Sequence, residues 1–137
     1  MPARDTYHDA VRNALVKDGW TITHDPFVLK WGERDFFVDL AAERVFAAEK
    51  AGKRIAVETK CFLGDSPMCD LEQALGQFLL YRAILEKTEP ARMLFLAVPE
   101  DAAAIFDEPI GQLVLETQSV RFFVFDLLAE EIKRWIP

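Results

Sequence analysis

The residues with the clearest chemical potential are two carboxylates and a lysine: Asp39, then Glu58 and Lys60 with Thr59 between them. Alternate side chains of an extended strand share one face, so Glu58 and Lys60 are expected to project together. If the strand that contains Asp39 pairs with theirs, the two carboxylates lie side by side and repel each other. A divalent cation removes that repulsion. Mg²⁺, or Mn²⁺ in its place, is expected because Mg²⁺ takes few carboxylates and keeps several waters.

Such an arrangement predicts hydrolysis of a phosphodiester bond. Asp39 and Glu58 would hold the metal together with the Thr59 carbonyl, and the metal would polarise the phosphoryl oxygen. Lys60 would orient the attacking water or stabilise negative charge on a phosphate. The alternative is a structural salt bridge without catalytic function, because Glu-x-Lys is frequent by chance and a strand acid beside a lysine often has a purely structural role.

Gln77 is the fourth candidate site residue. It lies one helical turn before Tyr81 in an otherwise apolar segment. A glutamine in such a helix needs a polar partner, and the carboxylate–lysine cluster is a candidate for it. Ordinary helix packing explains the same pair equally well.

Periodicity, caps and turns predict the elements that must position these residues. They indicate helices over residues 3–18 and 66–87, strands over 27–31, 35–40, 55–60, 93–98 and 120–127, and a helix from Pro99 that is interrupted or ends near Pro109. Two assignments stay open: a strand at 47–49 in a hairpin with 54–60, and an edge strand at 132–137, which could instead dock through Trp135. This order indicates an α/β fold with a mixed central sheet flanked by helices. No Gly-rich loop follows a strand, so nucleotide cofactors are disfavoured.

Length and composition narrow the function further. The 137 residues predict one domain, residues 1–137, and no apolar run is long enough to span a bilayer or to form a secretory signal, so we expect a cytoplasmic protein without a membrane partner. The formal net charge is −7. Residues 1–60 carry ten Lys and Arg against ten Asp and Glu, and residues 61–137 carry six against thirteen. A polyanion such as DNA would therefore approach the first half, with cations or a partner supplying positive charge.

Other residues have competing interpretations. His8 and Asp9 lie on the polar face of the first predicted helix, where one of them could add an acid to the metal site or simply face solvent. Trp20, Trp31 and Trp135 are interpreted as core or interface anchors rather than as platforms for stacking nucleic-acid bases.

The spacing Asp39-x18-Glu58-x-Lys60, in an α-β-β-β-α-β order, resembles the signature of the PD-(D/E)xK or restriction-endonuclease-like nucleases, with Val38 in place of the proline. Gln77 and Tyr81 resemble the Q-x-x-x-Y element of some of their branches. A more extensive resemblance covers nearly the whole chain and is carried by several segments: PARDTYHDAVRNALVKDGWTIT, DLAAER, VETKCFLG, ALGQFLLYR and EEIKRWIP. These segments resemble the XisH family, the fdxN element excision controlling factors.

The XisH resemblance implies a cyanobacterial-type accessory protein of programmed DNA element excision with an endonuclease-like fold. It also implies a recombinase and a small XisI-like protein as partners, and it makes Asp39, Glu58 and Lys60 the candidate site with Gln77 as a neighbour. Two functions remain open: a Mg²⁺-dependent endodeoxyribonuclease, or a catalytically silent control factor that binds a partner. A homo-oligomer is compatible with either.

Overall fold

The computed structural model describes residues 3–44, 52–62 and 66–136. The elements in chain order are α1 (Ala3–Lys17), β1 (Thr21–His24), β2 (Phe27–Trp31), β3 (Arg34–Val38), β4 (Leu40–Arg44), β5 (Lys53–Thr59), α2 (Pro67–Thr88), β6 (Arg92–Pro99), the 3₁₀ helix η1 (Ala103–Asp107), α3 (Pro109–Gln118), β7 (Phe122–Asp126) and β8 (Glu131–Ile136). None of the described helices is long and apolar enough to cross a membrane.

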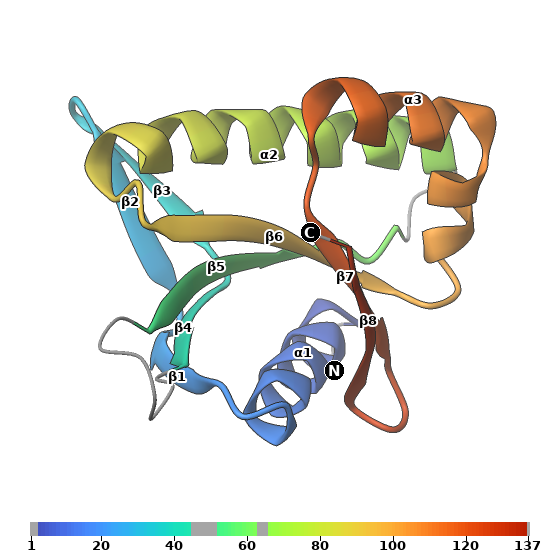
Figure 1. Ribbon diagram of the computed structural model, residues 1–137, viewed down its shortest axis with the longest axis horizontal. Helices are drawn as coiled ribbons and strands as arrows, with labels where there is room; N and C mark the ends of the chain where they lie inside the picture. Colours follow the sequence, from blue (N-terminus) through green and yellow to red (C-terminus); the bar gives the residue numbers. More distant parts are fainter. Residues whose placement is uncertain (1–2, 45–51, 63–65, 137) are drawn as a thin grey trace.

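Within the described residues, six strands form one mixed sheet in the order β1-β4-β5-β6-β7-β8. The strands β5, β6 and β7 run parallel at its centre, and antiparallel strands flank them on both sides. In Figure 1 α1 lies on one side of this sheet, and α2 and α3 lie on the other. The α/β class and the mixed sheet flanked by helices are therefore confirmed.

The strands β2 and β3 form a separate hairpin that leaves the sheet beside α2 (Figure 1). Its turn contains Gly32 at φ 62°, a left-handed conformation that glycine adopts without strain. Phe27, Leu29 and Val38 are buried in the cluster that includes α2. The hairpin therefore packs one face on that helix and turns the other face away.

Each face of the sheet carries its own hydrophobic cluster. On one face, Val11 and Leu15 of α1 pack with Val57 of β5. On the other face, Phe78 of α2 packs with Ala56 of the same strand. Because side chains alternate along β5, Glu58 belongs to the face that α2 covers.

The helix α2 begins as the sequence predicts. The Ser66 hydroxyl accepts a hydrogen bond from the Cys69 amide at 3.2 Å, and Pro67 occupies the first turn. Serine at the cap and proline in the first turn both stabilise a helix start, because one accepts an orphan amide bond and the other needs none.

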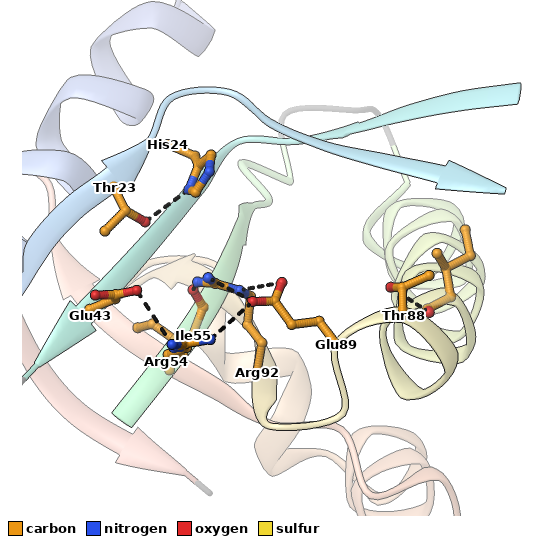
Figure 2. A network of polar contacts seen from close by, with 9 residues as sticks. Thr23, His24, Glu43, Arg54, Ile55, Thr88, Glu89 and Arg92 are labelled. Carbon is orange, nitrogen blue, oxygen red and sulfur yellow. Dashed lines mark hydrogen bonds and ion pairs between the residues drawn. The ribbon is translucent and has the colours of Figure 1, made fainter. Parts of the chain in front are cut away.

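A buried arginine joins the other end of α2 to the strands (Figure 2). Arg92, 5% exposed, donates to both carboxylate oxygens of Glu89 at 3.0 and 3.1 Å and to the Ile55 carbonyl at 2.9 Å. Its guanidinium also lies 4.8 Å from the centre of the Phe27 ring. Arg54 approaches the same Glu89 at 3.6 Å. One planar cation thus connects β2, β5, β6 and the residue that follows α2.

Several boundaries differ from the sequence prediction. The prediction misses β1, and the strand expected over 35–40 is broken at Asp39, where β3 ends and β4 begins. The helix expected from Pro99 is instead the short η1, and Pro109 starts α3 rather than ending a helix, because proline suits the first helical turn. The expectation for 47–49 lies outside the described residues. Residues 131–136 form the edge strand β8, and Trp135 also packs on the sheet.

The contact between η1 and α3 depends on Gly111. A Cβ atom at this position would lie 2.0 Å from the Ile105 carbonyl oxygen and 2.5 Å from the Phe106 Cα, both of them backbone atoms. Backbone cannot rotate away as a flexible side chain can, so the two segments would have to separate.

Substitution of two helical glycines tests this packing. We expect Gly111→Ala to lower the free energy of unfolding by about 2 kcal/mol or more, because overpacking forces the backbone apart. Gly76→Ala is the matched control: a Cβ there meets nothing within 4 Å, and alanine is better than glycine in an exposed helix by about 0.5 to 1 kcal/mol. Urea titration of both variants measures the difference. Equal effects at the two positions would contradict the close approach.

Candidate functional site

Asp39 lies at the point where the chain leaves the hairpin and enters the sheet. Leu40 of β4 pairs with Val57 of the antiparallel β5, so Asp39 falls opposite Glu58 when the register is continued by one residue. The break between β3 and β4 at Asp39 lets the hairpin turn toward α2 while β4 stays in the sheet. This local geometry brings the two carboxylates together at the end of β5.

Two reciprocal hydrogen bonds hold the carboxylates in place. The Asp39 amide donates to Glu58 Oε1 at 3.2 Å, and the Thr59 amide donates to Asp39 Oδ2 at 2.8 Å. Each side chain is thus fixed by the backbone of the opposite segment, and the carboxylates replace the ladder hydrogen bonds that end at this point.

Lys60 and Gln77 complete the cluster. Lys60 Nζ lies 3.7 Å from Glu58 Oε2 and donates a hydrogen bond to Gln77 Oε1 of α2. The Lys60 amide donates to the Ala97 carbonyl at 3.0 Å, which continues β5 alongside β6 for one more residue. The structure therefore brings all four predicted side chains, Asp39, Glu58, Lys60 and Gln77, into one connected group.

The electrostatics of this group centre on Glu58, which is 6% exposed. Burial, followed by the negative charge of Asp39, raises the pKa of its carboxyl to about 8, although Lys60 acts in the opposite direction. The single ammonium group therefore does not compensate both carboxylates, and Glu58 holds a proton at neutral pH in the absence of another cation.

Tyr81 is in electrostatic reach of the same carboxylates. Burial raises the pKa of its phenol above 10, and the charges of Glu58 and Asp39 add to the effect. Its ring packs against Phe36 at 6.2 Å between centroids. Tyr81 therefore contributes packing and a neutral hydroxyl, one helical turn beyond Gln77.

A pocket of about 420 Å³ opens beside this group, between the end of β5 and α2. Lys60 and Gln77 line it, together with Asp70 and Gln73. Asp70 and Gln73 are not among the predicted site residues, although they lie seven and four residues before Gln77, which places all three on one helix face. This spacing is the sequence pattern from which Asp70 and Gln73 could have been predicted to lie beside Gln77.

The donor set fits a cation that needs few protein ligands. No three His, Cys, Asp or Glu side chains among the described residues gather closely enough to hold a metal ion. Asp39 and Glu58 would provide two carboxylates and Thr59 a backbone carbonyl, which leaves other positions to water, as Mg²⁺ prefers. The raised pKa of Glu58 beside Asp39 is the observation in favour of this fit, because a cation would let both carboxyls ionise together.

The polar residues of α1 do not extend this group. His8 Nε2 lies 2.8 Å from Asp25 Oδ1, and Asp9 is exposed. The helix packs on the sheet face opposite the one from which Glu58 and Lys60 project. The structure favours the alternative in which Asp9 faces solvent, and His8 pairs with Asp25 rather than with the candidate site.

The raised pKa of Glu58 predicts a specific dependence of stability on pH. The folded chain holds the Glu58 proton up to about pH 8, whereas an unfolded chain loses it near the ordinary value of 4.5. The stabilisation is therefore complete below about pH 4.5 and is lost as the pH rises through 8, by up to about 1 kcal/mol for each pH unit. Urea unfolding in EDTA from pH 5 to about 9 should show this decline in the wild type and not in Glu58→Gln.

Glu116→Gln is the control for this comparison, because Glu116 is exposed on α3. It should keep the wild-type slope. A wild-type stability that rises with pH relative to Glu58→Gln would show that Glu58 is ionised in the folded chain.

Comparisons with known proteins agree on one family. The family model described as XisH protein matches residues 1–133. The crystal structure of an XisH family protein from Nostoc punctiforme PCC 73102 is similar with a TM-score of 0.88 and 36% identity over 97% of this chain and 100% of that one. The structure of an fdxN element excision controlling factor protein from Anabaena variabilis gives a TM-score of 0.86 and 38% identity over 98% and 100%. No curated protein matches. The chain belongs to the XisH family.

Proposed function

We propose that this protein is an accessory factor of programmed DNA element excision and that its candidate site hydrolyses phosphodiester bonds with Mg²⁺ or Mn²⁺. The excision role is supported by the name of the Anabaena variabilis relative, an fdxN element excision controlling factor. The hydrolytic role is supported by one observation above all, the buried and uncompensated pair of Asp39 and Glu58 beside Lys60. The proposal includes a restriction-endonuclease-like core built from α1, the strands up to β5, α2 and β6, in a cytoplasmic protein.

The division of labour among the residues follows from their contacts. Asp39 and Glu58 would hold the cation, which supplies Lewis-acid polarisation of a phosphoryl oxygen. Lys60 lines the pocket, so its ammonium group can stabilise negative charge that develops on a phosphate. Gln77 accepts from Lys60 and fixes the direction of that ammonium group. Gln77 is in this sense a positioning residue.

A plasmid-nicking assay tests the hydrolytic role. The wild type should nick DNA with Mg²⁺ or Mn²⁺ and not in EDTA. Lys60→Ala and Glu58→Ala should each lower the rate by about a hundredfold or more, since each removes a charge aimed at the reacting phosphate or its cation. Glu116→Gln should retain the wild-type rate, and circular dichroism checks that every variant is folded. Nicking that survives both site substitutions would exclude this site.

A second candidate function is that of a control factor that does not cut DNA and acts by binding a recombinase or a small XisI-like protein. The observation that favours it is the excess of acid in residues 61–137, thirteen Asp and Glu against six Lys and Arg, which repels DNA but not a protein.

Association with the small companion protein distinguishes the two functions. If binding alone is the function, size-exclusion chromatography should show the same complex for the wild type, Asp39→Asn and Glu58→Gln, with no change on addition of EDTA. A complex that forms only with a divalent cation and an intact Glu58 would contradict a role limited to binding.

A further inference from the structure

A second groove, separate from the candidate site, lies between the β2–β3 hairpin and α2. Its volume is about 300 Å³, and its floor is apolar, with Ile84 and Leu80 from the helix and Phe36 from β3. Trp31, at the end of β2, forms one side and is 54% exposed, while Leu80 is 47% exposed. Of the three tryptophans predicted to be core or interface anchors, Trp20 and Trp135 pack in the core. Trp31 lies outside the core and presents its indole ring to solvent, so of the predicted core or interface roles only an interface role is left for it.

The charge of this groove is opposite to that of the protein as a whole. Its described lining contains two cations, Arg34 and Lys87, and no carboxylate. Both cations are exposed, and neither has an ion pair within the described residues. Two neighbouring acids are turned elsewhere: Asp35 pairs with Lys30 on the outer face of the hairpin at 3.7 Å, and Glu86 lines a different pocket. A net charge of −7 makes this local positive patch notable.

The two walls of the groove lead to the candidate site. Arg34 begins β3, and the chain reaches Asp39 five residues later, a distance of about 17 Å along a strand. Lys87 lies ten residues after Gln77, about 15 Å along α2. Figure 1 shows the hairpin crossing α2 at the end of the helix that leads into β6. The groove and the candidate site therefore draw on the same hairpin and the same helix, although no residue lines both cavities.

We propose that this groove binds single-stranded DNA next to the candidate site, an inference that rests on the proposed phosphodiesterase function. An unpaired base stacks on the exposed Trp31 ring, and phosphates contact Arg34 and Lys87. Stacking needs a free base face, which a duplex does not offer, so the indole selects single strands. Arg34 and Lys87 are the two charged residues of the described groove lining, and this positive lining suits a polyanion. An acidic peptide also has compatible charge, but the walls shared with a phosphodiester site favour nucleic acid.

Fluorescence anisotropy with a labelled twelve-nucleotide oligothymidine in EDTA tests the proposal without any cleavage. Loss of one stacked base corresponds to about 1 to 3 kcal/mol, so Trp31→Ala should weaken binding by about 5- to 150-fold. Trp31→Phe should retain most of the affinity. Replacing both Arg34 and Lys87 with alanine should weaken binding and reduce the slope of log affinity against log salt by about 1.4, or about 0.7 for each phosphate.

The matched control replaces Lys133 and Arg134 of β8 with alanine, the same change of charge on the sheet's edge strand. It should bind like the wild type. Unfolding midpoints confirm that all variants are folded, which is expected because Trp31, Arg34 and Lys87 are exposed. Equal affinity of the wild type and Trp31→Ala would overturn the proposal. Binding of an acidic peptide that depends on Trp31, together with no binding of the oligonucleotide, would also overturn the proposal.

The failure of this inference is distinguishable from that of the proposed function. Trp31-dependent binding by a wild type that never nicks DNA would support the groove and reject the hydrolase. DNA nicking by a protein whose oligonucleotide affinity does not depend on Trp31 would support the hydrolase and reject the groove.

Discussion

The burial of one carboxylate constrains the rest of this structure. Glu58 lies at the end of a central strand with 6% of its surface exposed, where an uncompensated charge is costly. Its partners come from three directions: the Asp39 amide before β4, Lys60 at the continuation of β5, and, through Lys60, Gln77 of α2. Because breaking such a buried network leaves a polar group unpaired, the positions of β4, β5 and α2 depend on one another. The same dependence makes the group suited to chemistry, since its side chains are held before any ligand arrives.

The sequence predicts the elements whose pattern is local and misses those whose pattern is not. The helix from Ser66 is predictable from the sequence because its cap residue and its proline are adjacent. The strand β6 is predictable because its apolar run is long. By contrast, β4 is short and begins Leu40-Ala41-Ala42, buried on both faces without alternation, and alanine has little preference for strands. Only pairing with β5 makes this segment a strand. Similarly, β1 is mostly exposed and polar, so its place at the edge of the sheet depends on β4.

The candidate site shows the same limit. That Glu58 and Lys60 share a face follows from strand geometry, and that Gln77 needs a polar partner follows from its apolar surroundings. The approach of Asp39 to Glu58 required knowledge of the register between β4 and β5, which neither segment determines on its own. The exposure of Trp31 could not be inferred either, because a tryptophan at the end of an apolar strand is compatible with a core position and with a surface position alike.

The contacts of Arg92 have a consequence for recognition. By holding Glu89, the Ile55 carbonyl and the Phe27 ring at once, this guanidinium fixes the base of the hairpin relative to the end of α2. A lysine could offer only a point charge in place of the planar fork. The hairpin and α2, which carry Trp31 and Lys87, are thus preorganised. A ligand that binds between them loses its own conformational freedom, but the protein loses little.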